Sequence, residues 1–120
     1  MAIISDFLPL VDNGFNLEVG KDIDRHFAFE FGNAAQLDQK LILQYFYESH
    51  QDASNLRLRF RVNGNDIRTM TLNGNSFSTM HEILQGNNFA QGRNTIEAKI
   101  VGGDGSVTLS DIVLWFRRNA

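Results

Sequence analysis

The stretch from Asn55 to Gly64 alternates apolar with basic side chains and constrains the fold more than any other part of this sequence. Its apolar members are Leu56, Leu58, Phe60 and Val62, and its basic members are Arg57, Arg59 and Arg61. Because successive side chains of a strand point to opposite faces, the alternation predicts a strand with one buried face and one face in water. Asn63 and Gly64 adopt positive φ easily, so a tight turn into a neighbouring strand should follow.

Short segments of the same kind recur along the chain, and we count about eight strands in all. Besides the stretch above, the predicted strands are residues 3–11, 15–19, 25–31, 41–48, 66–72, 94–101 and 106–118. Residues 78–84 are compatible with a strand or with one helical turn, because Thr79 and Glu82 have the spacing of a capping box. No helix is long enough for a crossover between parallel strands, so we expect one all-β domain, residues 1–120, with the antiparallel β-sandwich architecture of a jelly roll.

Three details of the pattern predict local structure within this sandwich. Residues 41–48 are apolar on both faces, which is typical of a central strand that is covered on both sides. A second Asn-Gly pair at 73–74 predicts a meander, and the glycine-rich segment 102–105 predicts a tight hairpin. The last strand changes its apolar phase midway, which predicts a β-bulge near Ser110 and Asp111.

Three motifs stand in order in the second half of the chain. They are Val62-Asn63-Gly64, the run from Ile83-Leu84 to Phe89-Ala90-Gln91-Gly92-Arg93-Asn94-Thr95-Ile96, and Asp111-Ile112-Val113-Leu114 in the closing strand. In these motifs residues 55–116 resemble the second half of galactose-binding-like jelly-roll domains, which are attached to many glycosidases and are related to several carbohydrate-binding modules. In that family a Gly-x-Asn-x-Ile element opens a strand after a loop, and Gly92, Asn94 and Ile96 match it. The resemblance implies a β-sandwich and, by analogy, sugar binding.

We expect no enzyme activity, because the chain lacks the motifs that mark common catalytic and metal sites. It contains no cysteine, which excludes thiol catalysis, a zinc finger and a disulfide scaffold. The histidines His26, His50 and His81 are scattered along the sequence. Each is interpreted as a surface or loop residue, and no metal ligand is assigned.

Oxygen-bearing side chains in several turns raise the question of a calcium ion. They are Asp12, Asn13, Asp22, Asp24 and Asp104. Calcium takes six to eight converging oxygen ligands, and none of these groups forms a recognisable binding loop. They are interpreted as turn residues that cap backbone groups, so no cofactor is expected, with a structural calcium ion as the less favoured alternative.

One candidate for a binding surface is the row of Arg57, Arg59 and Arg61 on the outer face of its strand. Such a row forms either a groove for an acidic glycan or a solvated strand face with cross-strand partners such as Glu97 or Glu48. The second interpretation is favoured, because charged rows are usually solvated.

The other candidate is Trp115, the only tryptophan of the chain. If Ile112, Leu114 and Phe116 face the core, the alternation places Trp115 outward beside Arg117. An exposed indole on a sheet stacks against a sugar ring or anchors a protein interface. A third interpretation, that the strand is covered on both faces, stays open.

These features together favour a non-enzymatic carbohydrate-binding module, lectin-like or accessory, that recognises a glycan on a sheet face or at a loop end. Its candidate ligand-binding residues are Trp115, Arg57, Arg59, Arg61 and Arg117, and an acidic glycan is one candidate ligand. The alternative is an assembly domain that forms homo- or hetero-oligomers, because residues 1–54 carry a charge of about −6 and residues 55–120 about +3. Nucleic acid is not expected, since the net charge is −3 and no aromatic residue shares the predicted outward face of Arg57, Arg59 and Arg61.

The N-terminal residues do not predict export by a cleaved leader. They lack a basic region and reach Asp6 before any long apolar run, and no run in the chain approaches the length of a membrane span. We expect a cytoplasmic location and no membrane insertion, with export by a route without a cleaved signal as the alternative.

Overall fold

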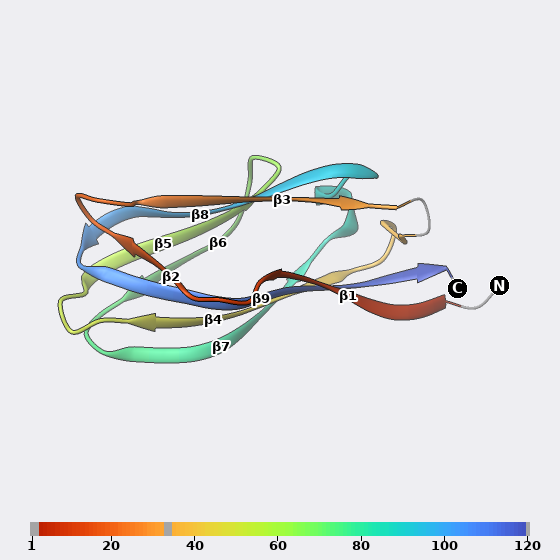
Figure 1. The fold of residues 1–120 in the computed structure, drawn as a ribbon. Helices are drawn as coiled ribbons and strands as arrows, with labels where there is room; N and C mark the ends of the chain where they lie inside the picture. Colours follow the sequence, from red (N-terminus) through yellow and green to blue (C-terminus); the bar gives the residue numbers. More distant parts are fainter. Residues whose placement is uncertain (1–2, 33–34, 120) are drawn as a thin grey trace.

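The computed structural model describes residues 3–32 and 35–119, which form an antiparallel β-sandwich (Figure 1). In chain order the elements are β1 (Ile3–Val11), β2 (Phe15–Glu18), β3 (Asp24–Phe31), β4 (Leu41–Ser49), β5 (Ser54–Val62), β6 (Asn65–Leu72), β7 (Ser76–Leu84), the 3-10 turn η1 (Gly86–Asn88), β8 (Gly92–Asp104) and β9 (Ser106–Asn119). The predicted fold class is confirmed. The described residues contain nine strands instead of about eight, and the additional strand is β7, where the sequence also allows a helical turn.

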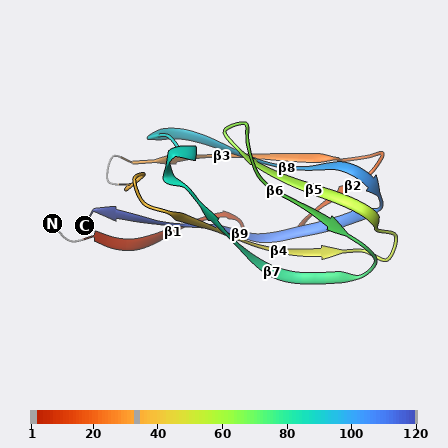
Figure 2. The same cartoon turned by 180° about the vertical axis from the view of Figure 1, so that it is seen from behind.

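Two sheets form the layers of the sandwich. The β9 sheet has the order β1-β9-β4-β7, with β2 also paired to β9, and the β8 sheet has the order β3-β8-β5-β6. Figures 1 and 2 show the two sheets as facing layers, seen from opposite sides. The domain measures 51 × 23 × 20 Å, and β1 begins where β9 ends because Ile3 is the register partner of Asn119.

The turns between strands differ in part from the prediction. Asn63 and Gly64, with φ values of 49° and 83°, close the β5–β6 hairpin as expected. The predicted meander and the predicted second hairpin are wrong, because the chain crosses from one sheet to the other after β6 and again after β8. At the second crossing Gly103 has a φ of 83°, and a Cβ there would lie 2.0 Å from the Asn55 carbonyl oxygen. Glycine is therefore required where the crossing packs on the start of β5.

The β-bulge predicted in the last strand is present. Gln44 of β4 pairs with Val113 of β9, whereas Phe46, two residues later, pairs with Ser110, three residues earlier, so β9 has one extra residue there. Asp111, inside this bulge, has a φ of 50°. The extra residue shifts the phase of burial, so that inward side chains lie at odd positions before the bulge and at even positions after it: Val107, Leu109, Ile112 and Leu114.

The core lies between the sheets and is built from alternate side chains of both. Leu56, Leu58, Phe60 and Val62 of β5 are all fully buried, which confirms the prediction for that strand. The ring of Phe60 packs on Tyr45 of β4 with 4.4 Å between centroids. Burial raises the pKa of the Tyr45 phenol, whose hydroxyl has no hydrogen-bond partner within the described part of the chain.

The strand β4 lies between β9 and β7, as expected of a central strand, but only its inner face is covered by the sandwich. Ile42 on the outer face is 38% exposed, and Phe46 on the same face is half-buried. The expectation of two covered faces is therefore wrong, and the β9 sheet presents apolar side chains to solvent. Among the described residues, no helix has the length and apolar character needed to cross a membrane.

Candidate functional site

A row of four apolar side chains crosses the outer face of the β9 sheet from one edge strand to the other. We call Phe7, Trp115, Ile42 and Ile83 the outer apolar row. Each is the register partner of the next, from β1 through β9 and β4 to β7. In the same order their exposed fractions are 50%, 39%, 38% and 67%. A continuous apolar band of this kind on a sheet face is a candidate surface for contact with another molecule.

The indole of Trp115 is held in a fixed position within this row. Its ring centroid lies 5.2 Å from that of Phe7, with the ring planes inclined by 41°. Its Nε1–H donates a hydrogen bond of 3.2 Å to Oε1 of Gln44 on the neighbouring strand. Because the ring is already ordered, a ligand that stacks on it loses little additional conformational entropy.

Two cationic side chains stand beside the indole. Lys40, directly before β4, and Arg117 of β9 line a cavity of about 340 Å³ together with Trp115, Ile42 and Ile83. Both side chains are exposed, and neither forms an ion pair with any residue of the described ranges 3–32 and 35–119. The predicted placement of Arg117 next to an outward Trp115 agrees with this geometry. The site thus combines an apolar floor with two available positive charges.

The other predicted site residues lie elsewhere. Arg57, Arg59 and Arg61 are on the outer face of the β8 sheet, whereas Trp115 is on the outer face of the β9 sheet. The structure does not bring these arginines and the indole together, because β5 and β9 belong to opposite layers of the sandwich (Figure 1).

The arginine row is paired with groups of its own sheet. Nη2 of Arg59 lies 3.0 Å from Oε1 of Glu97, and Nε of Arg61 lies 2.5 Å from Oδ1 of Asp66. The hydrogen bond from Arg61 lowers the pKa of the Asp66 carboxyl. Arg57 donates to the carbonyl oxygen of Val101 at 3.3 Å. This arrangement matches the favoured alternative of a solvated strand face with cross-strand partners.

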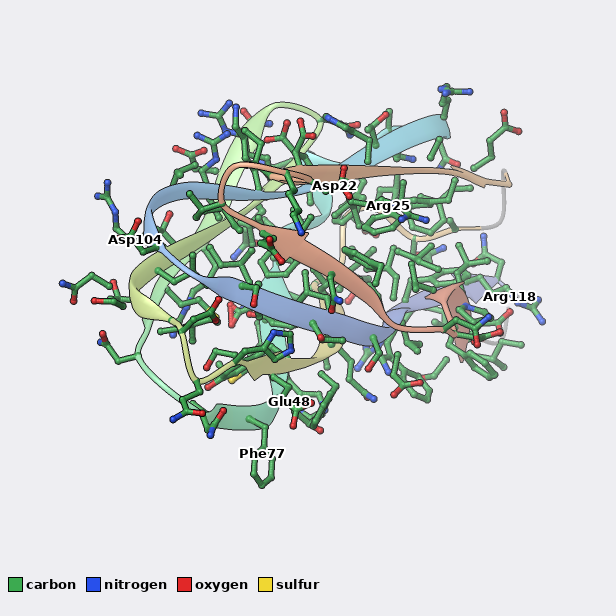
Figure 3. The ribbon with its side chains drawn as sticks, turned by 60° about the vertical axis from the view of Figure 1, so that its left-hand side comes forward. Asp22, Arg25, Glu48, Phe77, Asp104 and Arg118 are labelled. Carbon is green, nitrogen blue, oxygen red and sulfur yellow. The ribbon has the colours of Figure 1, made fainter. Side chains whose placement is uncertain are left out.

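Of the two acidic partners considered for that row, one is present. Glu97 on β8 is the register partner of Arg61 and forms the ion pair with Arg59. Glu48 is on β4, in the other sheet, and Figure 3 shows it on the side of the molecule that also carries Phe77.

The Gly-x-Asn-x-Ile element has a structural role. Asn94 is 1% exposed and uses its whole side-chain amide. Its Oδ1 accepts hydrogen bonds from the Ala90 N–H at 2.7 Å and from Nδ2 of Asn63 at 2.9 Å. Its Nδ2 donates to the carbonyl oxygens of Ala90 at 2.8 Å and Gly92 at 3.1 Å. The element therefore ties the loop before β8 to the β5–β6 turn.

Sequence reasoning did not find most of the outer apolar row or the cationic Lys40 beside it. Phe7, Lys40, Ile42 and Ile83 were missed, although one signal was present: the segment containing Ile42 is apolar on both faces. That pattern is equally consistent with a strand buried on both faces by the protein itself and with a strand that presents one apolar face to solvent. Phe7 and Trp115 are far apart in the sequence, and their contact depends on the register between β1 and β9, which the sequence pattern does not reveal.

Comparison with known proteins places this architecture among solved β-sandwich domains. No family model matches the sequence, and no curated protein matches it. A family 35 carbohydrate-binding module from an environmental isolate has a TM-score of 0.51 at 13% identity, covering 94% of this chain and 90% of that one. This chain has the fold of such carbohydrate-binding modules. The predicted resemblance to galactose-binding-like domains is thereby confirmed at the level of fold.

The same fold occurs as one part of longer proteins. Latent PorU from Porphyromonas gingivalis has a TM-score of 0.75 at 10% identity over 99% of this chain. A β-porphyranase of glycoside hydrolase family 86 from Bacteroides plebeius has a TM-score of 0.69 at 14% identity over 97% of this chain. This chain spans only 13% of the first protein and 21% of the second.

Proposed function

We propose that this domain is a non-enzymatic carbohydrate-binding module whose ligand lies across the outer apolar row. The observation that carries the proposal is the ordered, exposed indole of Trp115, packed against Phe7 on one side and in register with Ile42 on the other. The apolar C–H face of a pyranose ring stacks on such an aromatic surface, while its hydroxyl groups stay in water. The shared fold with a family 35 carbohydrate-binding module supports the same class of ligand.

We further propose that the glycan is anionic. Lys40 and Arg117 lie beside the indole without an ion-pair partner among the described residues, whereas Arg59 and Arg61 on the other sheet are paired with carboxylates. A carboxylate or sulfate group on a sugar that stacks over Trp115 would lie within reach of both cations. Arginine binds such groups with two parallel hydrogen bonds, which strengthens and orients the contact.

Isothermal titration calorimetry with a matched pair of sugars tests both parts of the proposal. Galacturonic-acid trimer and galactose trimer differ by the C6 carboxylate, so their difference in affinity measures the contribution of charge. We expect the acidic trimer to bind more tightly and to lose that advantage at high salt, because exposed charges are screened. If neither sugar binds at millimolar concentration, the proposal loses its support.

Replacing Trp115 with alanine should weaken binding of the acidic trimer at least about tenfold, which corresponds to about 1.4 kcal/mol. The indole supplies the stacking surface, and its loss leaves Phe7 without its partner. The matched control is Phe77→Ala on β7, an aromatic residue that is 70% exposed and projects away from the molecule (Figure 3). Equal affinities for the wild type and Trp115→Ala would contradict the proposed surface.

The contribution of charge is tested by two matched arginine variants, one in the proposed site and one on the opposite sheet. Arg117→Gln should reduce affinity for the acidic trimer several-fold and leave affinity for the neutral trimer unchanged, since a charge-assisted hydrogen bond is lost. Arg57→Gln removes an arginine from the opposite sheet and should change neither affinity.

A second candidate function is supported by the same row of residues. An exposed apolar band across four strands is also suited to bury against another copy of the chain or another protein, as in an assembly domain. Light scattering separates the two: dimers that dissociate in Trp115→Ala would favour assembly, whereas a monomer at high concentration would favour the glycan surface.

A further inference from the structure

Three side chains of types that can ligate metals, Asp24, His26 and Glu97, lie together on the outer face of the β8 sheet. Asp24 and His26 are two positions apart on β3, so both point to the same side of the strand. Glu97 on β8 is the register partner of His26. Figure 3 shows the intervening Arg25 on the side of β3 that faces β2, where its exposed guanidinium lies 5.0 Å from the ring centroid of Phe15. The alternation along β3 thus places His26 outward beside Glu97.

The donor atoms of this group have the spacing of ligands around one small ion. Nε2 of His26 lies 3.4 Å from Oδ2 of Asp24 and 3.5 Å from Oε2 of Glu97. Two ligands of a tetrahedral zinc ion, each about 2.0–2.2 Å from the metal, are about 3.3–3.6 Å apart. The three donor atoms all lie within 4.8 Å of one another. Asp24 is exposed, so its side chain is free to adjust toward an ion.

We propose that Asp24, His26 and Glu97 form a zinc-binding site. An imidazole with two carboxylates is a donor set that suits zinc, whereas calcium takes six to eight oxygen ligands. The site is independent of the proposed glycan surface, because β3 and β8 lie in the other sheet.

The carboxylate of Glu97 is oriented for metal binding because one of its oxygens is held by Arg59 while the other faces His26. Oε1 accepts the hydrogen bond from Arg59, and Oε2 is the atom that faces His26. The side chain of Glu97 is only 19% exposed, so its orientation is fixed by the sheet. A partner that holds the far oxygen of a ligating carboxylate orients it toward the metal. Nearby Arg59 and Lys99 also repel a cation, so we expect a modest affinity.

Space for a further ligand adjoins the group. A cavity of about 190 Å³ is lined by His26 and Glu97 together with Arg61, Gly64 and Thr95. This cavity beside His26 and Glu97 gives room for a water molecule as the fourth ligand that a zinc ion takes. A zinc ion bound there would cross-link the edge strand β3 to β8, the one strand with which β3 pairs in the described sheet.

Calorimetric titration of the wild-type protein with zinc chloride tests the site. We expect one equivalent to bind, zinc to raise the melting temperature, and calcium chloride to give neither effect. His26→Ala and Glu97→Gln should each weaken zinc binding at least about tenfold, as expected for loss of a ligand. Both substitutions are at the surface of the sheet, and Glu97→Gln retains an oxygen for Arg59.

The matched control is His81→Ala, which removes an exposed histidine from β7 in the other sheet. It should bind zinc as tightly as the wild type. Absence of zinc binding by the wild type would overturn the proposal. So would unchanged zinc affinity in His26→Ala or in Glu97→Gln, or a loss of affinity in His81→Ala as large as that in His26→Ala.

Discussion

Replacing Phe60 with alanine is expected to lower the free energy of unfolding by about 3–5 kcal/mol, the usual range for this change in a core. Phe60 is fully buried on β5 and packs against Tyr45 of the opposite sheet, with 4.4 Å between ring centroids and the ring planes inclined by 36°. The truncation removes this contact and leaves a cavity between two sheets whose backbones are held by hydrogen-bonded neighbours on both sides, so collapse around it is limited. A domain of this size has a total stability of about 5–15 kcal/mol, so the change is large.

Urea denaturation measures this effect, and the chain supplies a matched control. Phe77→Ala makes the same chemical change at a side chain that is 70% exposed and should shift stability by no more than about 0.5 kcal/mol. A similar loss in both variants would mean that Phe60 does not occupy the centre of the core.

Replacing Asn94 with alanine should destabilise the protein by about 3–5 kcal/mol, because several buried polar groups lose their partners at once. The amide N–H and the carbonyl of Ala90 and the carbonyl of Gly92 all bond to the Asn94 side chain. Alanine has no polar side-chain atom that could replace these bonds. The hydrogen bond from Asn63 of the β5–β6 turn to Asn94 is lost as well, and of the loop contacts Asn63 keeps its bond to the Asn88 carbonyl oxygen.

Asn94→Asp gives a sharper version of the same test. Aspartate has the shape of asparagine, but its ionised carboxylate faces the carbonyl oxygens of Ala90 and Gly92 instead of donating to them. Burial and these oxygens would raise the pKa of the carboxyl in the folded protein, so its protonated form is favoured there. The variant should be unstable at neutral pH and should regain stability, relative to the wild type, as the pH falls through the raised pKa. A deficit that does not change with pH would contradict the assigned hydrogen bonds.

The sheet architecture was largely accessible from the sequence because it depends on local alternation. The period of two in residues 56–62, the Asn63-Gly64 turn and the phase change that requires a bulge at Asp111 each reflect backbone geometry within a few residues. The crossings after β6 and β8 were not accessible in this way. A glycine-rich turn predicts a change of direction, whereas the sheet in which the next strand pairs is decided by contacts such as that of Gly103 with Asn55.

The candidate site was predicted only in part for the same reason. An outward Trp115 beside Arg117 follows from alternation along a single strand. The remaining members of the outer apolar row come from three other strands, and their alignment is a property of the register between strands. Nor does any single-strand pattern indicate that Arg59 and Trp115 lie on opposite layers. Sequence patterns therefore identified individual residues, and only the fold determines which of them share a surface.

The central claim is that ligand binds on the outer face of the β9 sheet, and a heteronuclear NMR titration of the labelled protein with galacturonic-acid trimer tests it most directly. The indole N–H of Trp115, now bonded to Gln44, and the amides around Ile42 and Arg117 should shift together and saturate at one affinity. Amides around Arg57 and Arg59 on the other sheet should stay in place. Saturable shifts confined to the arginine row, with the Trp115 indole signal unchanged, would contradict the account.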